Sequence, residues 1–150
     1  MRYSKSIELY IDEIRDNVGT YFQQAVSVYK IPLSVVFNKF IESRIAWGIE
    51  NQIPKFMVGM CGKEYVKYIF PNIHENYHID TDYGKEYWIG WALAYLQWCC
   101  GMRYVDMCRV VPLERISLMY RAYHEMDDVH LREFADKFLI ENSGPWSFGK

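Results

Sequence analysis

The feature that most restricts the fold is a tryptophan- and tyrosine-rich run from Trp88 to Met102. Its apolar residues lie on all sides of a helix instead of along one stripe, which is typical of a helix buried within a protein. The run is 15 residues long and contains Gln97, so it is too short to cross a bilayer, and we expect no membrane association. We therefore predict that Glu86 to Gly101 forms a central helix, capped by Gly101, that the other helices enclose.

A second strong pattern lies near the N-terminus, where apolar residues recur alternately every four and every three positions. This spacing places one continuous apolar stripe along a helix. Gly19 lies in its middle, where a break is possible, and Lys30-Ile31-Pro32 ends it. The stripe allows packing within the chain or self-association, so a homo-oligomer is possible. Its members are Ile7, Ile11, Ile14, Val18, Tyr21, Ala25 and Val28.

Other segments also have helical spacing. Pro32 suits the first turn of a second helix that continues to Gly48, and Asn51 to Pro54 breaks it. The last helix starts at Asp127 or Asp128 and runs through Ile140. We expect Val129, Phe134, Phe138 and Leu139 to face inward, and we predict three shorter helices over 63–70, 103–110 and 112–120.

No segment alternates between apolar and polar residues over enough positions to predict a sheet. Residues 71–84 (PNIHENYHIDTDYG) are rich in turn formers and indicate a long surface loop. We therefore predict an all-α, irregular single-domain bundle of six or seven helices, with a possible seam in the loop 71–84.

Charge and cysteine content restrict the function. The net charge is -2 and the pI is near 6.1, so nothing attracts the whole chain to nucleic acid or to an anionic membrane. The N-terminus reaches Asp12 and Glu13 without the apolar stretch of a signal peptide. The four cysteines show no disulfide framework or CxxC pair, so we expect them to be reduced, as in a cytoplasmic protein. They are Cys61, Cys99, Cys100 and Cys108. We also expect no cofactor.

Residues 74–78 (HENYH) match the H-E-x-x-H pattern of zinc peptidases. That chemistry needs a helix, which places both imidazoles on one face and the glutamate beside the metal-bound water. Here the match follows Pro71 and runs into the turn formers before Gly84, and no third histidine follows. We expect a polar loop and no metal; a metal-dependent hydrolase at His74 and His78 is an alternative hypothesis.

Cys61 stands just before the helix predicted for 63–70. A thiol at a helix N-terminus can be nucleophilic because its pKa is lowered. The sequence offers no base or carboxylate to activate it, so we predict no catalytic role for Cys61.

Residues 24–43 have a helix, a turn and a second helix, as a helix-turn-helix has. DNA recognition needs basic and amide side chains on the second helix and cations for the phosphates. Asn38, Lys39 and Arg44 are few, and Glu42 opposes them. A DNA-binding autoregulator is therefore a second alternative, and an αα-hairpin is the structural explanation.

Aromatic residues are the most prominent candidates for recognition, because tyrosine and tryptophan are favoured at binding hot spots. Those of the central helix that share one face are either the core or a groove for a partner. A second group, with several polar tips, lies in the turn predicted after residue 120. The candidate partner-binding residues are Tyr87, Trp91, Tyr95, Tyr120, Tyr123 and His124.

The C-terminal half resembles a known group of proteins. The run EYWIGWALAYLQW (86–98), then Val111-Pro112, then Met119-Tyr120-x-x-Tyr123-His124-Glu125-Met126-Asp127 resembles a family of small uncharacterised bacterial helical proteins. They are often encoded beside short genes of toxin–antitoxin character, some of which resemble ADP-ribosyltransferases. The resemblance covers about Glu86 to Phe134 and implies a component that binds or restrains a partner protein, with no catalytic residues to carry over. The expected function is that of a non-enzymatic protein-binding component, with an antitoxin-like role as its expected form.

Overall fold

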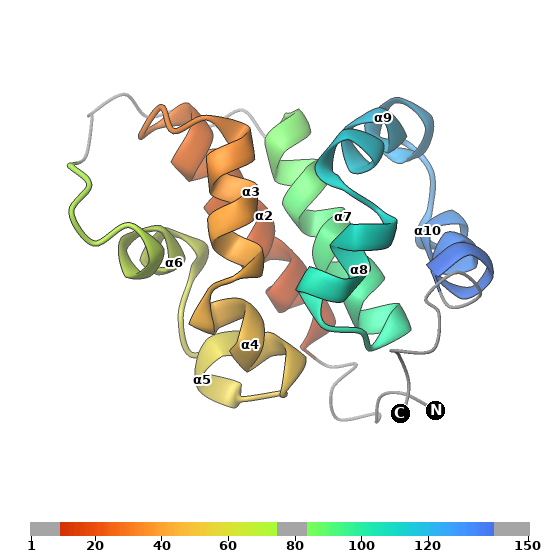
Figure 1. Ribbon diagram of the computed structural model, residues 1–150, viewed down its shortest axis with the longest axis horizontal. Helices are drawn as coiled ribbons and strands as arrows, with labels where there is room; N and C mark the ends of the chain where they lie inside the picture. The colour runs from red at the N-terminus through yellow and green to blue at the C-terminus, as the bar shows by residue number, and fades with distance from the viewer. Residues whose placement is uncertain (1–9, 75–83, 140–150) are drawn as a thin grey trace.

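Helix α7 (Lys85–Cys100) runs through the centre of the molecule, as the sequence predicts. Buried side chains lie on all its sides, because α2 and α3 flank it on one side and α8, α9 and α10 on the other (Figure 1). Gly101 ends the helix with a φ of 69°. Glycine adopts this left-handed conformation without steric cost, so the predicted C-cap is confirmed.

The structure is a computed structural model, and it describes residues 10–74 and 84–139 except the side chain of Phe138. Within these ranges it contains nine α-helices, one π-helical turn and no strand, which confirms the all-α prediction. The helices outnumber the six or seven expected because one predicted helix is divided and one short helix has no sequence signal.

Helix α2 (Ile11–Ser27) packs along α7, and this is the most extensive helix–helix contact in the described chain. The apolar stripe is buried within the protein itself from Ile14 to Val28. The helix continues through Gly19 without the break that was considered possible. Gly19 and Gly90 lie where the two helices cross. A Cβ atom at Gly90 would lie 2.6 Å from the carbonyl oxygen of Val18. The two glycines therefore let the helix backbones approach closely.

The segment predicted as one helix after Pro32 forms two, α3 (Leu33–Ile41) and α4 (Arg44–Glu50). The prediction of one continuous helix is wrong because Ser43 starts a new helix. Its backbone is extended, and its hydroxyl accepts a hydrogen bond from the Ala46 N–H at 3.1 Å. Helix α5 (Pro54–Met57) is a single short turn that the sequence pattern does not reveal.

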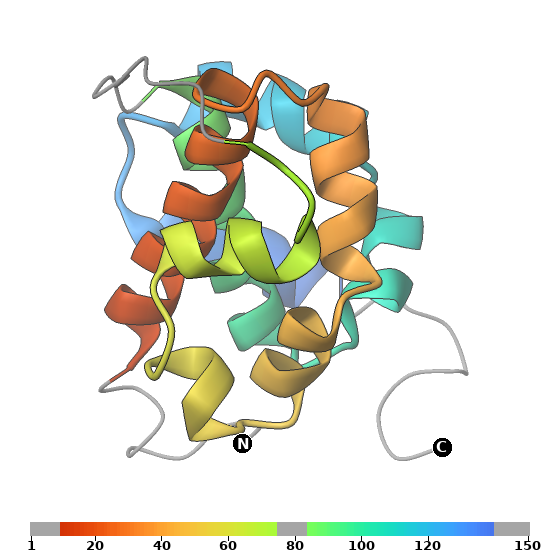
Figure 2. The same cartoon turned by 90° about the vertical axis from the view of Figure 1, so that its left-hand side faces the viewer.

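Helix α6 (Gly62–Ile69) lies across α2, on the side seen in Figure 2. Its first residue, Gly62, meets the backbone of α2 so closely that a Cβ atom there would lie 2.5 Å from the Asn17 carbonyl oxygen. Helix α2 therefore contacts α6 on one side and α7 on another.

The chain returns over α7 through α8 (Tyr104–Val110), α9 (Leu113–Tyr123) and α10 (Asp128–Phe134). The Asp127 carboxylate caps α10 by accepting the Val129 N–H. The π-helical turn η1 (Ala135–Leu139) continues from α10. Leu139 is buried and Phe134 is half-buried, as predicted, but Val129 is 56% exposed, so its predicted inward orientation is wrong. Val129 occupies the first turn of α10, a helix whose buried residue is Leu131.

The buried apolar residues form one cluster that contains side chains from Ile14 to Leu139, on both sides of the 71–84 segment. Most of that segment, residues 75–83, lies outside the described residues. Among the helices of the described ranges, none has both the length and the apolar character needed to cross a membrane.

Candidate binding groove beside the central helix

The predicted binding residues fall into two groups, and the first lies on α7. Tyr87 faces α2, where its hydroxyl donates a hydrogen bond to Asp16 Oδ1 at 2.6 Å. Trp91 and Tyr95 lie one and two turns further on and cover the side chain of Arg15, also on α2. This half of the predicted set is therefore a contact surface between α7 and α2, with Tyr95 buried and the other two half-buried.

The second group lies at the end of α9. The Tyr120 ring stacks on His124 at a centroid distance of 4.2 Å, and His124 Nδ1 lies 2.6 Å from the Tyr120 carbonyl oxygen. Tyr123 is 6.4 Å, ring to ring, from His130 of α10. Trp88 joins the groups, because its ring meets Tyr120 edge-on at 5.7 Å.

Arg15 is the main residue of this candidate site that the sequence analysis does not identify. Its guanidinium carbon lies 3.2 Å from the centre of the Trp91 ring and 4.3 Å from that of Tyr95. Its Nε donates a hydrogen bond to the Trp91 carbonyl oxygen at 3.3 Å. Because the rings fix its plane and the carbonyl fixes its rotation, the remaining N–H groups point in one set direction.

Those N–H groups meet Asp128, the first residue of α10. Arg15 Nη1 and Nη2 donate to the two carboxylate oxygens of Asp128 at 2.7 and 3.0 Å. This two-pronged pairing is the strongest form of the arginine–carboxylate interaction. The Arg15 side chain is only 2% exposed, whereas that of Asp128 is 44% exposed, so the carboxylate also reaches solvent.

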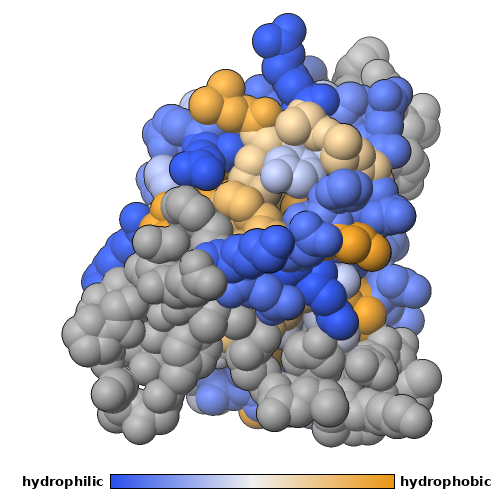
Figure 3. Space-filling model, turned by 90° about the vertical axis from the view of Figure 1, so that its right-hand side faces the viewer, coloured by the Kyte–Doolittle hydropathy of each residue, from blue (hydrophilic) through white to orange (hydrophobic). Residues whose placement is uncertain are grey.

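The Arg15–Asp128 pair borders a groove of about 370 Å³ between α2, α7 and α10, which we call the α2–α7–α10 groove. Tyr95 and Trp98 form its aromatic wall and stack on each other at 5.8 Å, and Arg132 lies over Trp98 at 5.7 Å. Figure 3 shows the side of the molecule that carries α9 and α10, where hydrophobic residues reach the surface among hydrophilic ones. The groove is lined by Ile11, Asp12, Arg15, Tyr95, Trp98, Asp128, Val129 and Arg132.

Burial holds two titratable groups at the groove in their neutral forms. The pKa of Tyr95 is raised to about 12, because its phenol is buried and lies near Cys99. Burial likewise raises the pKa of the Cys99 thiol, although Arg132 opposes this rise. The groove lining has four charged side chains, which belong to two aspartates and two arginines. Together with the aromatic wall, they suit a partner surface that carries both charged and apolar residues.

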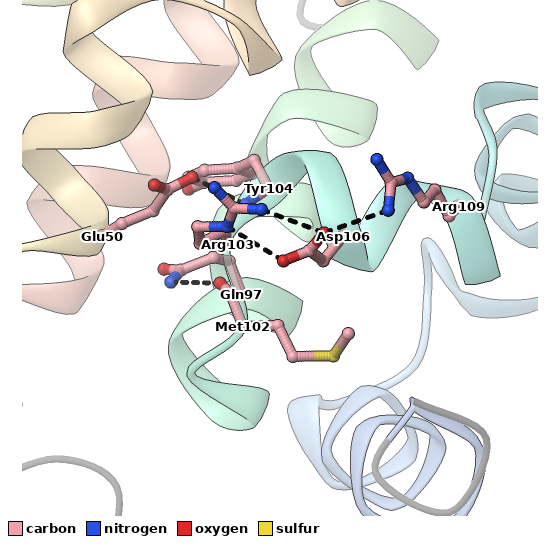
Figure 4. A network of polar contacts seen from close by, with 7 residues as sticks. All are labelled: Glu50, Gln97, Met102, Arg103, Tyr104, Asp106 and Arg109. Carbon is pink, nitrogen blue, oxygen red and sulfur yellow. Dashed lines mark hydrogen bonds and ion pairs between the residues drawn. The ribbon is translucent and has the colours of Figure 1, made fainter. Parts of the chain in front are cut away.

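A second polar cluster joins α4 to α8 (Figure 4). The Glu50 carboxylate accepts a hydrogen bond from the Tyr104 N–H at 2.6 Å, and Asp106 pairs with Arg103 and Arg109. Burial raises the pKa of Glu50 despite this hydrogen bond and the nearby Arg103. A small cavity of about 70 Å³ lies beside Glu50 and Gln97. This cluster therefore holds two helices together.

The other sequence motifs do not combine into a reactive site in the described residues. Cys61 is exposed, and its backbone N–H donates to Glu64 Oε1 at 3.0 Å, so its position begins α6. His74 is exposed, and the rest of the H-E-x-x-H match, including His78, lies outside the described residues. Across the described ranges, no three His, Cys, Asp or Glu side chains are grouped to hold a metal.

The helix pair of the DNA-binding alternative is antiparallel, with α3 running back beside α2 (Figures 1 and 2). Lys30 makes the turn between them with a φ of 58°. Asn38 and Lys39 are exposed on α3, and Arg44 lies over the Trp47 ring at 4.8 Å. These residues supply few cations for the phosphates of a DNA duplex.

The sequence contains one signal for Arg15: it is the only basic residue of α2 and is next to Ile14 of the apolar stripe. An arginine beside an apolar stripe is expected to be partly buried. This pattern does not reveal the partner of Arg15, because Asp128 lies 113 positions away. No family model, curated protein or solved structure matches this chain.

Proposed function

We propose that this protein is a non-enzymatic binding component that holds a partner protein in the α2–α7–α10 groove. The observation that carries this proposal is the composition of the groove, where Tyr95, Trp98 and Arg132 lie together beside the exposed Val129. Tryptophan, tyrosine and arginine contribute most of the binding energy at protein interfaces. An exposed valine beside them adds apolar area that a partner can cover.

The rigidity of the groove also supports binding. Trp98 stacks on Tyr95, and Tyr95 in turn lies over Arg15, so each aromatic side chain is held by its neighbour. Side chains that are already ordered lose little conformational entropy when a partner arrives. The groove therefore has the preorganisation that a protein-binding site needs.

The role within the cell follows from the family resemblance of Glu86 to Phe134. We infer an antitoxin-like role in a bacterial toxin–antitoxin-type module, in the cytoplasm, where the protein covers the active surface of its partner. The groove lies between the resembling segment and α2, so the resembling residues supply Tyr95, Trp98 and Val129 to it.

A pull-down from the native host tests the proposal, with one variant in the groove and a matched one outside it. Val129→Glu places a charge in the groove at an exposed position, so it should abolish retention of the partner and leave the fold intact. Leu118→Glu is the control, because Leu118 is 71% exposed on α9 and is not part of the groove lining. Protection of cells when the protein is co-expressed with the captured partner would establish the antitoxin-like direction.

The same experiment separates the alternatives. Equal retention by the two glutamate variants would place the interface elsewhere and contradict the proposal. Retention of DNA that weakens with salt and with Lys39→Ala or Arg44→Ala would favour the autoregulator. Stoichiometric zinc that is lost on His78→Ala would favour the hydrolase.

A further inference from the structure

The two members of the Arg15–Asp128 pair are held very differently. Arg15 is fixed by two aromatic rings and by the Trp91 carbonyl, and its side chain is almost fully buried. Asp128 belongs to a seven-residue helix that buries only Leu131 among its described side chains, and its own side chain is 44% exposed. The cation is therefore preorganised, whereas its anion is not.

A fixed guanidinium whose two NH2 groups point into a groove is the arrangement by which proteins bind planar anions. A buried arginine also requires an anion, because an unpaired buried charge is strongly unfavourable. Asp128 supplies that anion in this structure, and its side chain, unlike that of Arg15, is in contact with solvent.

We propose that Arg15 is a carboxylate-binding site for an acidic side chain of a partner protein, and that Asp128 occupies it as an internal substitute when no partner is bound. This inference rests on the proposed function and names the chemistry of the partner. The partner presents an aspartate or glutamate among apolar residues, because the site is flanked by Tyr95, Trp98 and Val129.

The surrounding charges favour a carboxylate over a phosphate. Arg15 offers two N–H groups in one plane, which match the two oxygens of a carboxylate. Asp12 lines the same groove and would repel the second negative charge of a phosphate.

Chemical rescue of Asp128→Ala tests the site. This variant leaves Arg15 without its carboxylate, so sodium acetate should stabilise it saturably, whereas sodium chloride at equal concentration should not. At ten times the dissociation constant of acetate, we expect a rise in Tm of roughly 3–6 °C. Wild-type protein and Asp12→Ala, which loses a different acid of the same groove, should show no such rise. Asp128→Asn replaces Asp128→Ala if the latter does not fold.

The outcomes are decisive for the chemistry of the site. Rescue by acetate that disappears in the Arg15→Lys/Asp128→Ala double variant supports the two-pronged site, because lysine is a point charge without the planar fork. Rescue by inorganic phosphate but not by acetate would overturn the carboxylate assignment. Equal effects of acetate on the wild type and on Asp128→Ala, or no effect beyond chloride, would overturn the site itself.

A second measurement tests whether Asp128 competes with the ligand. The probe is acetyl-Glu-amide, which carries one side-chain carboxylate. It should bind Asp128→Asn about tenfold more tightly than wild type, because the internal competitor is weakened. If Asp128 only tethers α10 to α2, Asp128→Asn should bind acetyl-Glu-amide equally or more weakly than wild type. That result would show that Asp128 does not compete with the ligand. If acetate rescues Asp128→Ala but the pull-down captures no protein partner, the proposed function alone is contradicted. If a partner is captured and Arg15→Lys does not affect its binding, this inference alone is contradicted.

Discussion

At the scale of single residues, the Arg15–Asp128 pair joins a buried guanidinium to a half-exposed carboxylate. Asp128→Ala should lower the free energy of unfolding by about 2–4 kcal/mol, because it leaves a buried charge without its partner. Arg15→Met should cost only about 1–2 kcal/mol, because methionine still packs between the rings and the freed Asp128 carboxylate is hydrated. Urea unfolding of both variants measures the difference. A larger loss for Arg15→Met would show that packing and not charge dominates at this position.

The Glu50 carboxylate should make stability depend on pH. Burial raises its pKa above the ordinary value of 4.5, so the folded protein disfavours the ionised form. Stability from protonated Glu50 is therefore complete below that ordinary value and is lost as the pH rises through the higher pKa of the folded state. Glu50→Gln stays neutral and can still accept the Tyr104 N–H.

Unfolding free energies of wild type and Glu50→Gln, measured between about pH 4 and about pH 8, test this expectation. The variant should gain stability relative to wild type as the pH rises. A relative loss would show that the hydrogen bond to Tyr104 and the charge of Arg103 outweigh the burial of Glu50.

Of the six predicted binding residues, Tyr95 alone belongs to the lining of the groove, and Trp98 beside it was not among them. Helical spacing placed Tyr87, Trp91 and Tyr95 on one face, and all three do face α2. Arg15 and Asp128 were missed because their pairing depends on how α10 returns over α7. Val129 was placed inward because a valine suits a buried stripe, whereas the groove leaves it exposed.

At the scale of helices, the crossing of α2 and α7 depends on glycine. A Cβ atom at Gly90 would lie 2.6 Å from the Val18 carbonyl oxygen and 2.9 Å from the Gly19 Cα, and neither backbone atom can move aside. Gly90→Ala should therefore destabilise the protein by about 2–3 kcal/mol, despite the better helix propensity of alanine. Gly84→Ala is the matched control.

Gly84 precedes α7 with a φ of -93°, and a Cβ atom there meets nothing within 4 Å. Its replacement by alanine should change the unfolding free energy by less than about 1 kcal/mol. Thermal unfolding of the two variants compares them directly. Equal stability of the two would show that α2 and α7 can separate without cost.

Strong periodic patterns predicted the long helices, and local chemistry decided the short ones. The helices α2 and α7 follow from their apolar patterns, and α7 ends where Gly101 predicted. The division at Ser43 was missed because the apolar spacing continues across it, while a single hydroxyl cap starts α4. A four-residue helix such as α5 has no period to detect.

At the scale of the whole molecule, both sides of the 71–84 segment contribute to one hydrophobic cluster. Residues before it supply α2 to α6, and residues after it supply α7 to η1. The central contact, between α2 and α7, joins the two halves, so neither half can bury its apolar face alone. A single domain of this kind is expected to unfold cooperatively.

We expect the chain to unfold in one transition. Tryptophan fluorescence reports chiefly on the surroundings of α7, which carries Trp88, Trp91 and Trp98, whereas far-UV circular dichroism reports on all the helices. Both signals should therefore give the same urea midpoint, because loss of the α2–α7 contact exposes the core of both halves at once. In Gly90→Ala the two midpoints should fall together, since the crossing is shared. A circular-dichroism midpoint that stays unchanged while the fluorescence midpoint falls would mean that the N-terminal helices hold together without α7 and that the seam at 71–84 separates two domains.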